Sequence, residues 1–230
     1  MNDGDTTSSQ IDHLIPPEIS NDKFYRAIAQ VASLPLVRTI LEIGSSSGAG
    51  STEALVKGAL EQEEPPEIHC IEISRTRFAA LSKRWADVPF VHCHRTSSVP
   101  IEQFPTASEV ESFYRSTRSR LRRYPLEMVL GWLAQDIEYL REHDLSRSGI
   151  KDIRERFGIE TFDAVLIDGS EFTGRAELAE VYGARFLMLD DTRAFKNWDN
   201  YRALKEDPDY RERMASRFTR NGFAIFERRD

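Results

Sequence analysis

Five short apolar segments, separated by stretches with helical periodicity, constrain the fold most strongly. Each segment is apolar along nearly its whole length, whereas a strand with one solvated face alternates apolar and polar residues. Apolar strands that alternate with helices form a parallel sheet covered by helices on both faces. The chain is therefore predicted to be an α/β protein with a Rossmann-like, doubly wound sheet. The five predicted strands span residues 37–44, 68–74, 88–94, 162–168 and 185–190.

The C-terminal segment predicts two further strands in an antiparallel hairpin. Asn221-Gly222 lies between residues 216–220 and residues 223–228. Asn-Gly is a typical hairpin turn because both residues accept a positive φ. With this hairpin, the prediction becomes a mostly parallel, seven-stranded sheet with a C-terminal antiparallel hairpin.

A helical insertion is predicted between the third and fourth strands. Residues 100–160 contain two stretches of helical periodicity, which exceeds the roughly 12 residues that a crossover needs. The excess would cover an active site or form the surface of a homodimer. The polar residues 1–19 are expected to be a disordered leader, and residues 20–230 a single domain.

Charge and composition limit the kinds of binding partner and the cellular location that are expected for this chain. The net charge of −7 argues against nucleic-acid binding, which depends on neutralising phosphates. No apolar stretch reaches the roughly 18 residues of a membrane helix, and the acidic, polar N-terminus is unlike a signal peptide. Cys70 and Cys93 lie within apolar segments and are expected to be buried, reduced thiols. These features predict a cytoplasmic protein without a membrane partner.

The turn after the first predicted strand has the sequence LEIGSSSGAG, residues 41–50. Dinucleotide-binding turns have the spacing G-x-G-x-x-G, in which the second glycine lets the backbone approach a pyrophosphate. Ser46 occupies that position, so the turn argues against NAD or FAD and suits a ligand without a phosphate. The alternative is a glycine-rich turn that tight packing alone requires.

Two motifs resemble those of class I S-adenosylmethionine (SAM)-dependent methyltransferases. ILEIGSSSG at residues 40–48 is similar to their first motif, and IEIS at 71–74 is similar to their second. The resemblance implies SAM as the cofactor, with Glu42 near its methionine part and Glu72 accepting the ribose hydroxyls. The implied cofactor-binding residues are Glu42, Gly44, Ser45, Ser46, Gly48, Ser51, Glu72, Ile73, Thr96, Ser97 and Asp168, of which Thr96 and Ser97 would contact adenine.

Three carboxylates follow the fourth and fifth predicted strands at the point where each strand ends. Asp168 ends one strand, and Asp190 and Asp191 end the other. Adjacent parallel strands lie about 4.8 Å apart, so these side chains would converge if the two strands are neighbours, and their charges would repel. A hard divalent cation such as Mg²⁺ or Ca²⁺ would relieve the repulsion. The alternative is that the Asp pair caps the next helix and Asp168 begins a turn.

The same three positions resemble the metal site of metal-dependent O-methyltransferases, including the catechol, caffeoyl-CoA and macrocin-type sugar enzymes. Asp168, Asp190 and Asp191 match their metal ligands, and the double Asp is closer to the sugar and antibiotic branch. The catechol branch has a lysine base three residues after its first metal Asp, where this chain has Glu171. This resemblance implies a Mg²⁺ site at Asp168, Asp190 and Asp191.

The function predicted from the sequence is SAM-dependent, Mg²⁺-dependent O-methylation of a small-molecule or glycan hydroxyl. Asp168 would act through the metal, and Glu171 or Lys196 would assist proton removal. Two alternatives stay open: a class I methyltransferase without a metal, and a non-catalytic module that binds SAM or a nucleotide. The sequence does not identify the acceptor.

Overall fold

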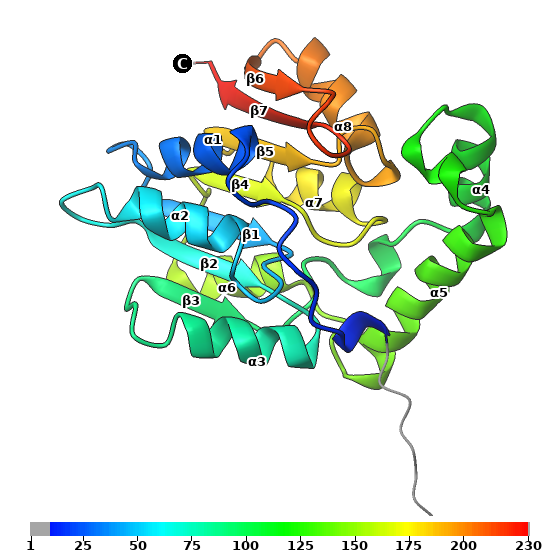
Figure 1. Cartoon of the computed structure of the whole chain (residues 1–230), viewed down its shortest axis with the longest axis horizontal. Helices are drawn as coiled ribbons and strands as arrows, with labels where there is room; N and C mark the ends of the chain where they lie inside the picture. The colour runs from blue at the N-terminus through cyan, green and yellow to red at the C-terminus, as the bar shows by residue number, and fades with distance from the viewer. Residues whose placement is uncertain (1–9, 230) are drawn as a thin grey trace, which may run out of the picture.

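The computed structural model describes residues 10–229 and contains one seven-stranded sheet (Figure 1). The strand order is β3-β2-β1-β4-β5-β7-β6, with β6 and β7 antiparallel to their neighbours and the other strands parallel. This arrangement confirms the predicted doubly wound sheet with a C-terminal antiparallel hairpin. The strands are β1 (Thr39–Ile43), β2 (Glu67–Ile71), β3 (Val91–His94), β4 (Ala164–Ile167), β5 (Phe186–Asp190), β6 (Tyr210–Ser216) and β7 (Phe223–Arg228).

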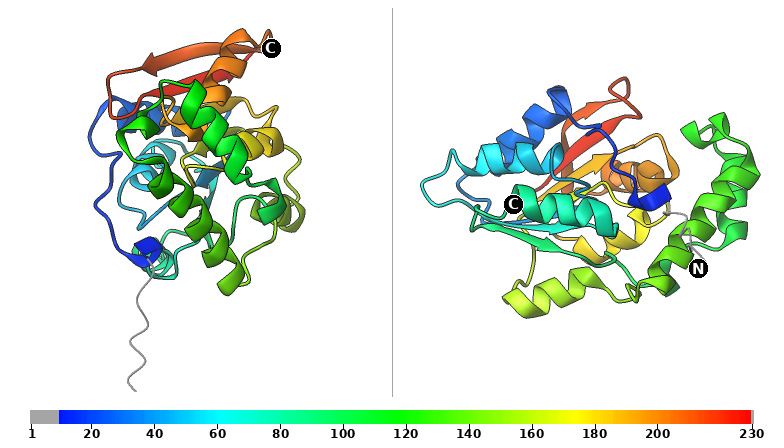
Figure 2. Two further views of the ribbon diagram at one scale, coloured as in Figure 1. Left: turned by 90° about the vertical axis from the view of Figure 1, so that its right-hand side faces the viewer. Right: turned by 60° about the horizontal axis from the view of Figure 1, so that its bottom comes forward.

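Two layers of helices cover the sheet, as the apolar strands require (Figure 2). Along β5, Phe186 and Met188 pack into one core, while Leu187 and Leu189 pack into the other, because successive side chains of a strand point to opposite faces. One face is covered by α1 (Lys23–Ala32), α2 (Ser51–Ala59) and α3 (Arg75–Arg84), and the other by α6 (Gly149–Phe157), α7 (Gly174–Val181) and α8 (Phe195–Glu206).

The insertion between β3 and β4 forms a separate small core at the carboxyl edge of the sheet (Figure 1). Val110, Leu121, Val129 and Leu133 pack there against Phe172. Its last helix, α6, instead contributes Ile150 and Ile153 to the sheet core. The other elements of the insertion are η2 (Ile101–Gln103), α4 (Ala107–Ser116), η3 (Arg120–Arg123) and α5 (Leu126–Glu142).

The second strand of the hairpin lies where the sequence predicts, but the first, expected at residues 216–220, is found at Tyr210–Ser216, and the turn is longer than two residues. Strand β6 ends at Ser216, and residues 217–222 form the connection to β7. Arg220 and Gly222 have positive φ values of 49° and 89°, whereas Asn221 is not among the positive-φ residues. The longer loop reaches the segment after β5, where Thr192 N donates to Gly222 O.

Residues 10–19 have a defined path, in contrast to the disordered leader expected for 1–19; residues 1–9 lie outside the described residues. The segment of residues 10–19 begins with η1 (Gln10–Asp12). Asp12 Oδ1 accepts hydrogen bonds from Ser74 Oγ (2.9 Å) and from the Tyr139 hydroxyl (2.8 Å). Ile19, at the other end of the segment, is buried. We call Gln10–Ile19 the N-terminal strap, because it joins α3 to α5 across the carboxyl edge of the sheet. Within the described residues, every helix is too short or too polar to cross a bilayer.

Candidate functional site

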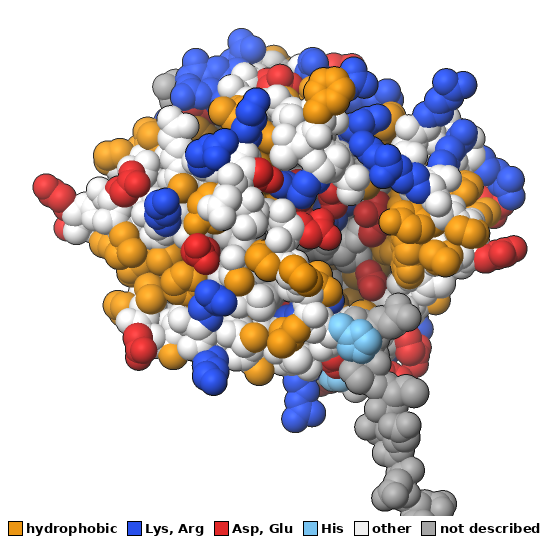
Figure 3. Space-filling model, in the orientation of Figure 1, with side chains coloured by type: hydrophobic (Ala, Val, Ile, Leu, Met, Phe, Trp, Pro, Cys, Tyr) orange, Lys and Arg blue, Asp and Glu red, His pale blue; other side chains and the backbone are white. Residues whose placement is uncertain are grey.

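A cavity of about 420 Å³ lies beyond the carboxyl ends of β1, β2 and β4, which is where open α/β sheets bind ligands. The N-terminal strap and α5 form its other walls, and acidic side chains gather in the hollow between the sheet and the insertion (Figure 3). Its volume falls within the range of about 300–1,000 Å³ that is usual for small-ligand sites. The cavity therefore is large enough for a cofactor of the size of SAM.

The glycine turn after β1 lies directly against the end of β4. Gly44 has a φ of +89°, and a Cβ there would lie 2.2 Å from the backbone oxygen of Asp168. The amides of Gly44 and Ser45 both donate to Ile71 O at 3.0 Å, which fixes the turn to β2. Only glycine allows this turn to pass so close to the neighbouring strand.

Glu72 fixes the far side of the same turn. Its Oε2 accepts from Ser46 N and its Oε1 accepts from Ser74 N, both at 2.8 Å. Burial raises the pKa of this carboxyl, although the hydrogen bonds oppose the shift. Each carboxylate oxygen has a second lone pair, so Glu72 can hold the turn and still accept a hydrogen bond from a ligand in the cavity that it lines.

Most of the predicted cofactor-binding residues line the cavity, but three do not. Glu42 is fully buried beneath it, where Thr52 Oγ1 donates to its Oε2 at 2.6 Å. Gly48 is covered by Trp85, whose Nε1 donates to Gly48 O. Thr96 packs against Gly149 instead. Those that line the cavity are Gly44, Ser45, Ser46, Ser51, Glu72, Ile73, Ser97 and Asp168.

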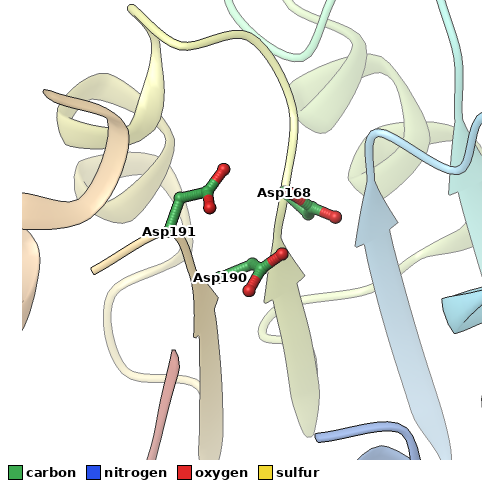
Figure 4. Close-up of side chains that lie close together, drawn as sticks. All are labelled: Asp168, Asp190 and Asp191. Carbon is green, nitrogen blue, oxygen red and sulfur yellow. The ribbon is translucent and has the colours of Figure 1, made fainter. Parts of the chain in front are cut away.

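The three carboxylates predicted to converge do so (Figure 4). One oxygen from each of Asp168, Asp190 and Asp191 lies within 4.8 Å of the others. The parallel pairing of β4 with β5 brings them together, as the sequence predicts. Burial is the main cause that raises the pKa of Asp168 well above its usual value and that of Asp190 to about 6, and the neighbouring carboxylates add to both shifts.

Two basic side chains neutralise this cluster from within the protein. Lys196 Nζ lies 2.8 Å from Asp168 Oδ1 and 3.3 Å from Asp191 Oδ2. Arg220 Nη2 lies 2.7 Å from Asp190 Oδ1, and the same guanidinium also pairs with Asp22. Burial disfavours the charged form of Lys196, but the surrounding carboxylates outweigh it and raise its pKa well above the usual value.

The arrangement of these cations does not leave a place for Mg²⁺. The oxygen donors suit that ion, and Asp191 Oδ1 is buried without a hydrogen-bond partner among the described residues. However, Lys196 Nζ is already at hydrogen-bond distance from Asp168 Oδ1, an oxygen that Mg²⁺ would need at about 2.1 Å. A Mg²⁺ ion on the remaining oxygens would face the ammonium at close range. The residues as arranged do not fit the ion, and we derive no catalytic step through a metal.

Glu171 faces the start of α8 and is not among the residues that line the cavity. Its Oε1 accepts from Phe195 N at 2.7 Å and Lys196 N at 3.4 Å, so it caps the first turn of the helix. Burial raises its pKa to about 7. Of the residues predicted to be catalytic, Asp168 and Lys196 line the cavity.

The insertion contributes to the cavity a carboxylate that was not among the residues predicted from the sequence. Asp136 on α5 lines it, and Ser170 Oγ donates to Asp136 Oδ2 at 2.5 Å. Burial raises the pKa of Asp136 to about 6. A signal was present in the sequence, because Asp136 lies three residues after Leu133 and four before Leu140, on the apolar face of the helix. The cavity-lining residues of the strap (Ile11, Ile15, Pro16, Pro17, Glu18 and Ile19) had no comparable signal.

Comparison with known proteins addresses the fold. No protein-family model and no curated protein matches the chain. The O-methyltransferase from Bacillus cereus in complex with SAH is 12% identical, with a TM-score of 0.54 over 93% of this chain and 84% of that chain. Cofactor-bound Rv0187 from MTB is 14% identical, with a TM-score of 0.55 over 97% and 87% of the two chains. A methyltransferase from Geobacter sulfurreducens is 10% identical, with a TM-score of 0.51 over 93% and 81%.

The chain has the class I methyltransferase fold. The cavity lies at one edge of the sheet. The glycine turn after β1, the acidic residue after β2 and the ends of β4 and β5 all meet at this edge. At identities of 10–14% the likeness concerns the backbone arrangement. The cofactor, base and acceptor therefore depend on the side chains of the site.

Proposed function

We propose that this chain transfers a methyl group from SAM to a hydroxyl of a small-molecule or glycan acceptor. The observation that carries the proposal is one continuous cavity that contains both a cofactor-type turn and a charged reaction centre. The turn is held by Glu72, and the reaction centre consists of Asp168, Lys196 and Asp136. In contrast to the Mg²⁺ dependence predicted from the sequence, we expect none, because Lys196 already lies among the carboxylates.

The cofactor end of the cavity suits a ligand with two hydroxyls and no phosphate. Gly44, Ser45 and Ser46 form its floor, and Glu72 offers carboxylate oxygens to a ribose. The side chain of Ser46 stands where a dinucleotide-binding turn needs glycine. Bound SAM would supply an electrophilic methyl group on a sulfonium.

Glu72→Gln is expected to weaken SAM binding by about 10- to 100-fold, measured by isothermal titration calorimetry. The amide cannot accept from both Ser46 N and Ser74 N as the carboxylate does, and a hydrogen bond to a charged group contributes about 1.5–3 kcal/mol. Glu63→Gln, on an exposed loop, is the matched control and should bind as the wild type does. Wild-type protein that binds neither SAM nor SAH would contradict the proposed function.

The proton of the acceptor hydroxyl needs a base, and the geometry favours Asp136. Methyl transfer forms a bond between the acceptor oxygen and the methyl carbon, breaks the carbon–sulfur bond, and releases the hydroxyl proton. Asp136 lines the cavity, and its Oδ2 is oriented by Ser170. With a pKa of about 6 it is mostly ionised at neutral pH and can accept that proton.

Asp136→Asn is expected to lower kcat by about 100-fold or more, with little change in SAM affinity. Because the base must be ionised, wild-type turnover should rise with pH up to about 6 and then level off, and the variant should lose this dependence. Turnover is measured as SAH release with a panel of phenol, sugar and polyol acceptors. Glu138→Gln, two residues away and exposed on the same helix, is the control.

A non-catalytic SAM-binding module is the remaining alternative. Such a module would bind SAM by calorimetry yet release no SAH with any acceptor in the panel, and Asp136→Asn would have no effect on it. The two measurements therefore separate the failure of cofactor binding from the failure of catalysis.

A further inference from the structure

Lys196 lies among the three carboxylates at the position where the metal-dependent arrangement would have its cation. We propose that the ammonium of Lys196 permanently replaces a divalent cation at this site, so that the chain binds no Mg²⁺ there and needs none. The effect on catalysis rests on the proposed function. The occupancy of the site does not, and it can be tested without SAM or an acceptor.

The contacts of the ammonium match those expected of a resident cation. Nζ is 2.8 Å from Asp168 Oδ1 and 3.3 Å from Asp191 Oδ2, and the Lys196 side chain is 7% exposed. Asp168 and Asp191 come from the ends of two neighbouring strands, so a single ammonium bridges β4 and β5. An ammonium has three donors and no acceptor, which suits a site made of carboxylate oxygens.

The backbone that carries Lys196 is fixed on both sides, so the ammonium is not a mobile surface group. On one side, Glu171 Oε1 accepts from Lys196 N. On the other, Asn197 Nδ2 donates to Ile167 O at 3.0 Å and to Asp190 O at 2.7 Å, which joins the start of α8 to the ends of β4 and β5. Asn200 Nδ2 in turn donates to Asn197 Oδ1 at 2.8 Å. All three amide contacts are buried.

The third carboxylate is neutralised separately. Asp190 is 1% exposed, and its Oδ1 accepts from Arg220 Nη2 at 2.7 Å. Arg220 comes from the loop between β6 and β7 and has a positive φ, so this loop conformation directs the guanidinium to the strand end. Three carboxylates thus face two resident cations, and the repulsion that would otherwise recruit Mg²⁺ is already largely relieved.

Lys196 also lines the cavity, where it can contact the acceptor oxygen. A cation at this point stabilises the negative charge that develops on that oxygen as its proton leaves. A bound metal ion stabilises such charge in the same way in other enzymes. Lys196 would therefore supply the charge, and Asp136 would accept the proton.

The test is a titration with Mn²⁺ at about pH 8, followed by electron paramagnetic resonance. Wild-type protein is expected to show no saturable site up to about 1 mM, since the ammonium repels the ion. Lys196→Met removes the charge and keeps most of the side-chain volume. It is expected to gain one Mn²⁺ site at least about 100-fold tighter than wild type, which Mg²⁺ displaces and a second change, Asp190→Asn, removes.

Lys205→Met is the matched control, because Lys205 lies on the same helix but is exposed, and it should behave as the wild type does. A saturable wild-type site that Asp190→Asn abolishes would overturn the proposal, as would a folded Lys196→Met protein that gains no site. If Lys196→Met does not fold, Lys196→Gln replaces it, and the wild-type titration decides by itself whether the site takes a divalent ion. Because neither arm uses SAM, loss of the proposed function would leave the result unaffected.

Discussion

Gly44→Ala is expected to abolish SAM binding and to lower the free energy of unfolding by about 3 kcal/mol or more. The new methyl group would lie 2.2 Å from Asp168 O and 2.8 Å from Gly169 Cα, both of which are backbone atoms that cannot rotate away. Either the turn or the end of β4 must move, and both form the cavity. Calorimetry with SAM and urea denaturation measure the two effects.

Gly158→Ala separates this overlap from the cost of a positive φ. Gly158 caps the C-terminus of α6 with a φ of +65°, and a Cβ there meets no atom within 4 Å. Its replacement should cost only the left-handed strain, about 1–2 kcal/mol, and leave SAM binding unchanged. Equal effects of the two substitutions on SAM binding would contradict the close approach of the glycine turn to β4.

Acidification below about pH 6.5 is expected to destabilise the protein through a stack of imidazoles centred on the buried His69. His69 on β2 is fully buried and stacks on His92 and His94 of β3, with the Phe157 ring against its edge. Burial and the imidazoles of His94 and His92 lower the pKa of His69 to about 3. Burial, His92 and Arg156 lower the pKa of His94 to about 4. The unfolded chain takes up these protons near pH 6.5 and the folded chain does not, so stability falls as the pH falls from about 6.5 towards 3.

The size of the effect is large enough to measure by denaturation. One pKa unit corresponds to about 1.4 kcal/mol, so the His69 shift alone amounts to roughly 5 kcal/mol across this range. Buried carboxylates with raised pKa values, such as Asp190, change stability in the opposite direction. The decisive quantity is therefore the difference in pH slope between wild type and His69→Leu, with exposed His13→Leu as the control. Identical slopes in all three proteins would show that His69 is not the source.

Local patterns predicted the sheet and the position of its functional edge. Runs such as residues 162–168 and 185–190 are apolar on both faces, which requires a covered parallel strand, and parallel strands end at a common edge. Asp168, Asp190 and Asp191 therefore had to meet once β4 and β5 paired. The residues of the glycine turn followed from the same argument, because the turn after β1 ends at that edge too.

The partners of those carboxylates could not be read from local pattern. Arg220 lies 30 residues beyond Asp190 in a loop whose sequence indicates a two-residue turn. Asp136 reaches the cavity only because the insertion folds back over the sheet edge. The strap is polar at its start and resembles a disordered leader in sequence. Nevertheless, Asp12 accepts a hydrogen bond from the hydroxyl of Tyr139, which lies 127 residues further along the chain.

The sequence by itself determined the doubly wound sheet, the glycine turn and the convergence of three carboxylates, since each depends on strand periodicity and on adjacent strand ends. The tertiary structure decided what neutralises the carboxylates. A divalent cation and a buried ammonium can each neutralise the same carboxylates. The sequence offers both possibilities, because it contains the three aspartates as ligands for the cation and Lys196 as the source of the ammonium. The choice depends on whether Lys196 points into the cluster, and long-range hydrogen bonds of Asn197 and Glu171 hold the backbone that carries it.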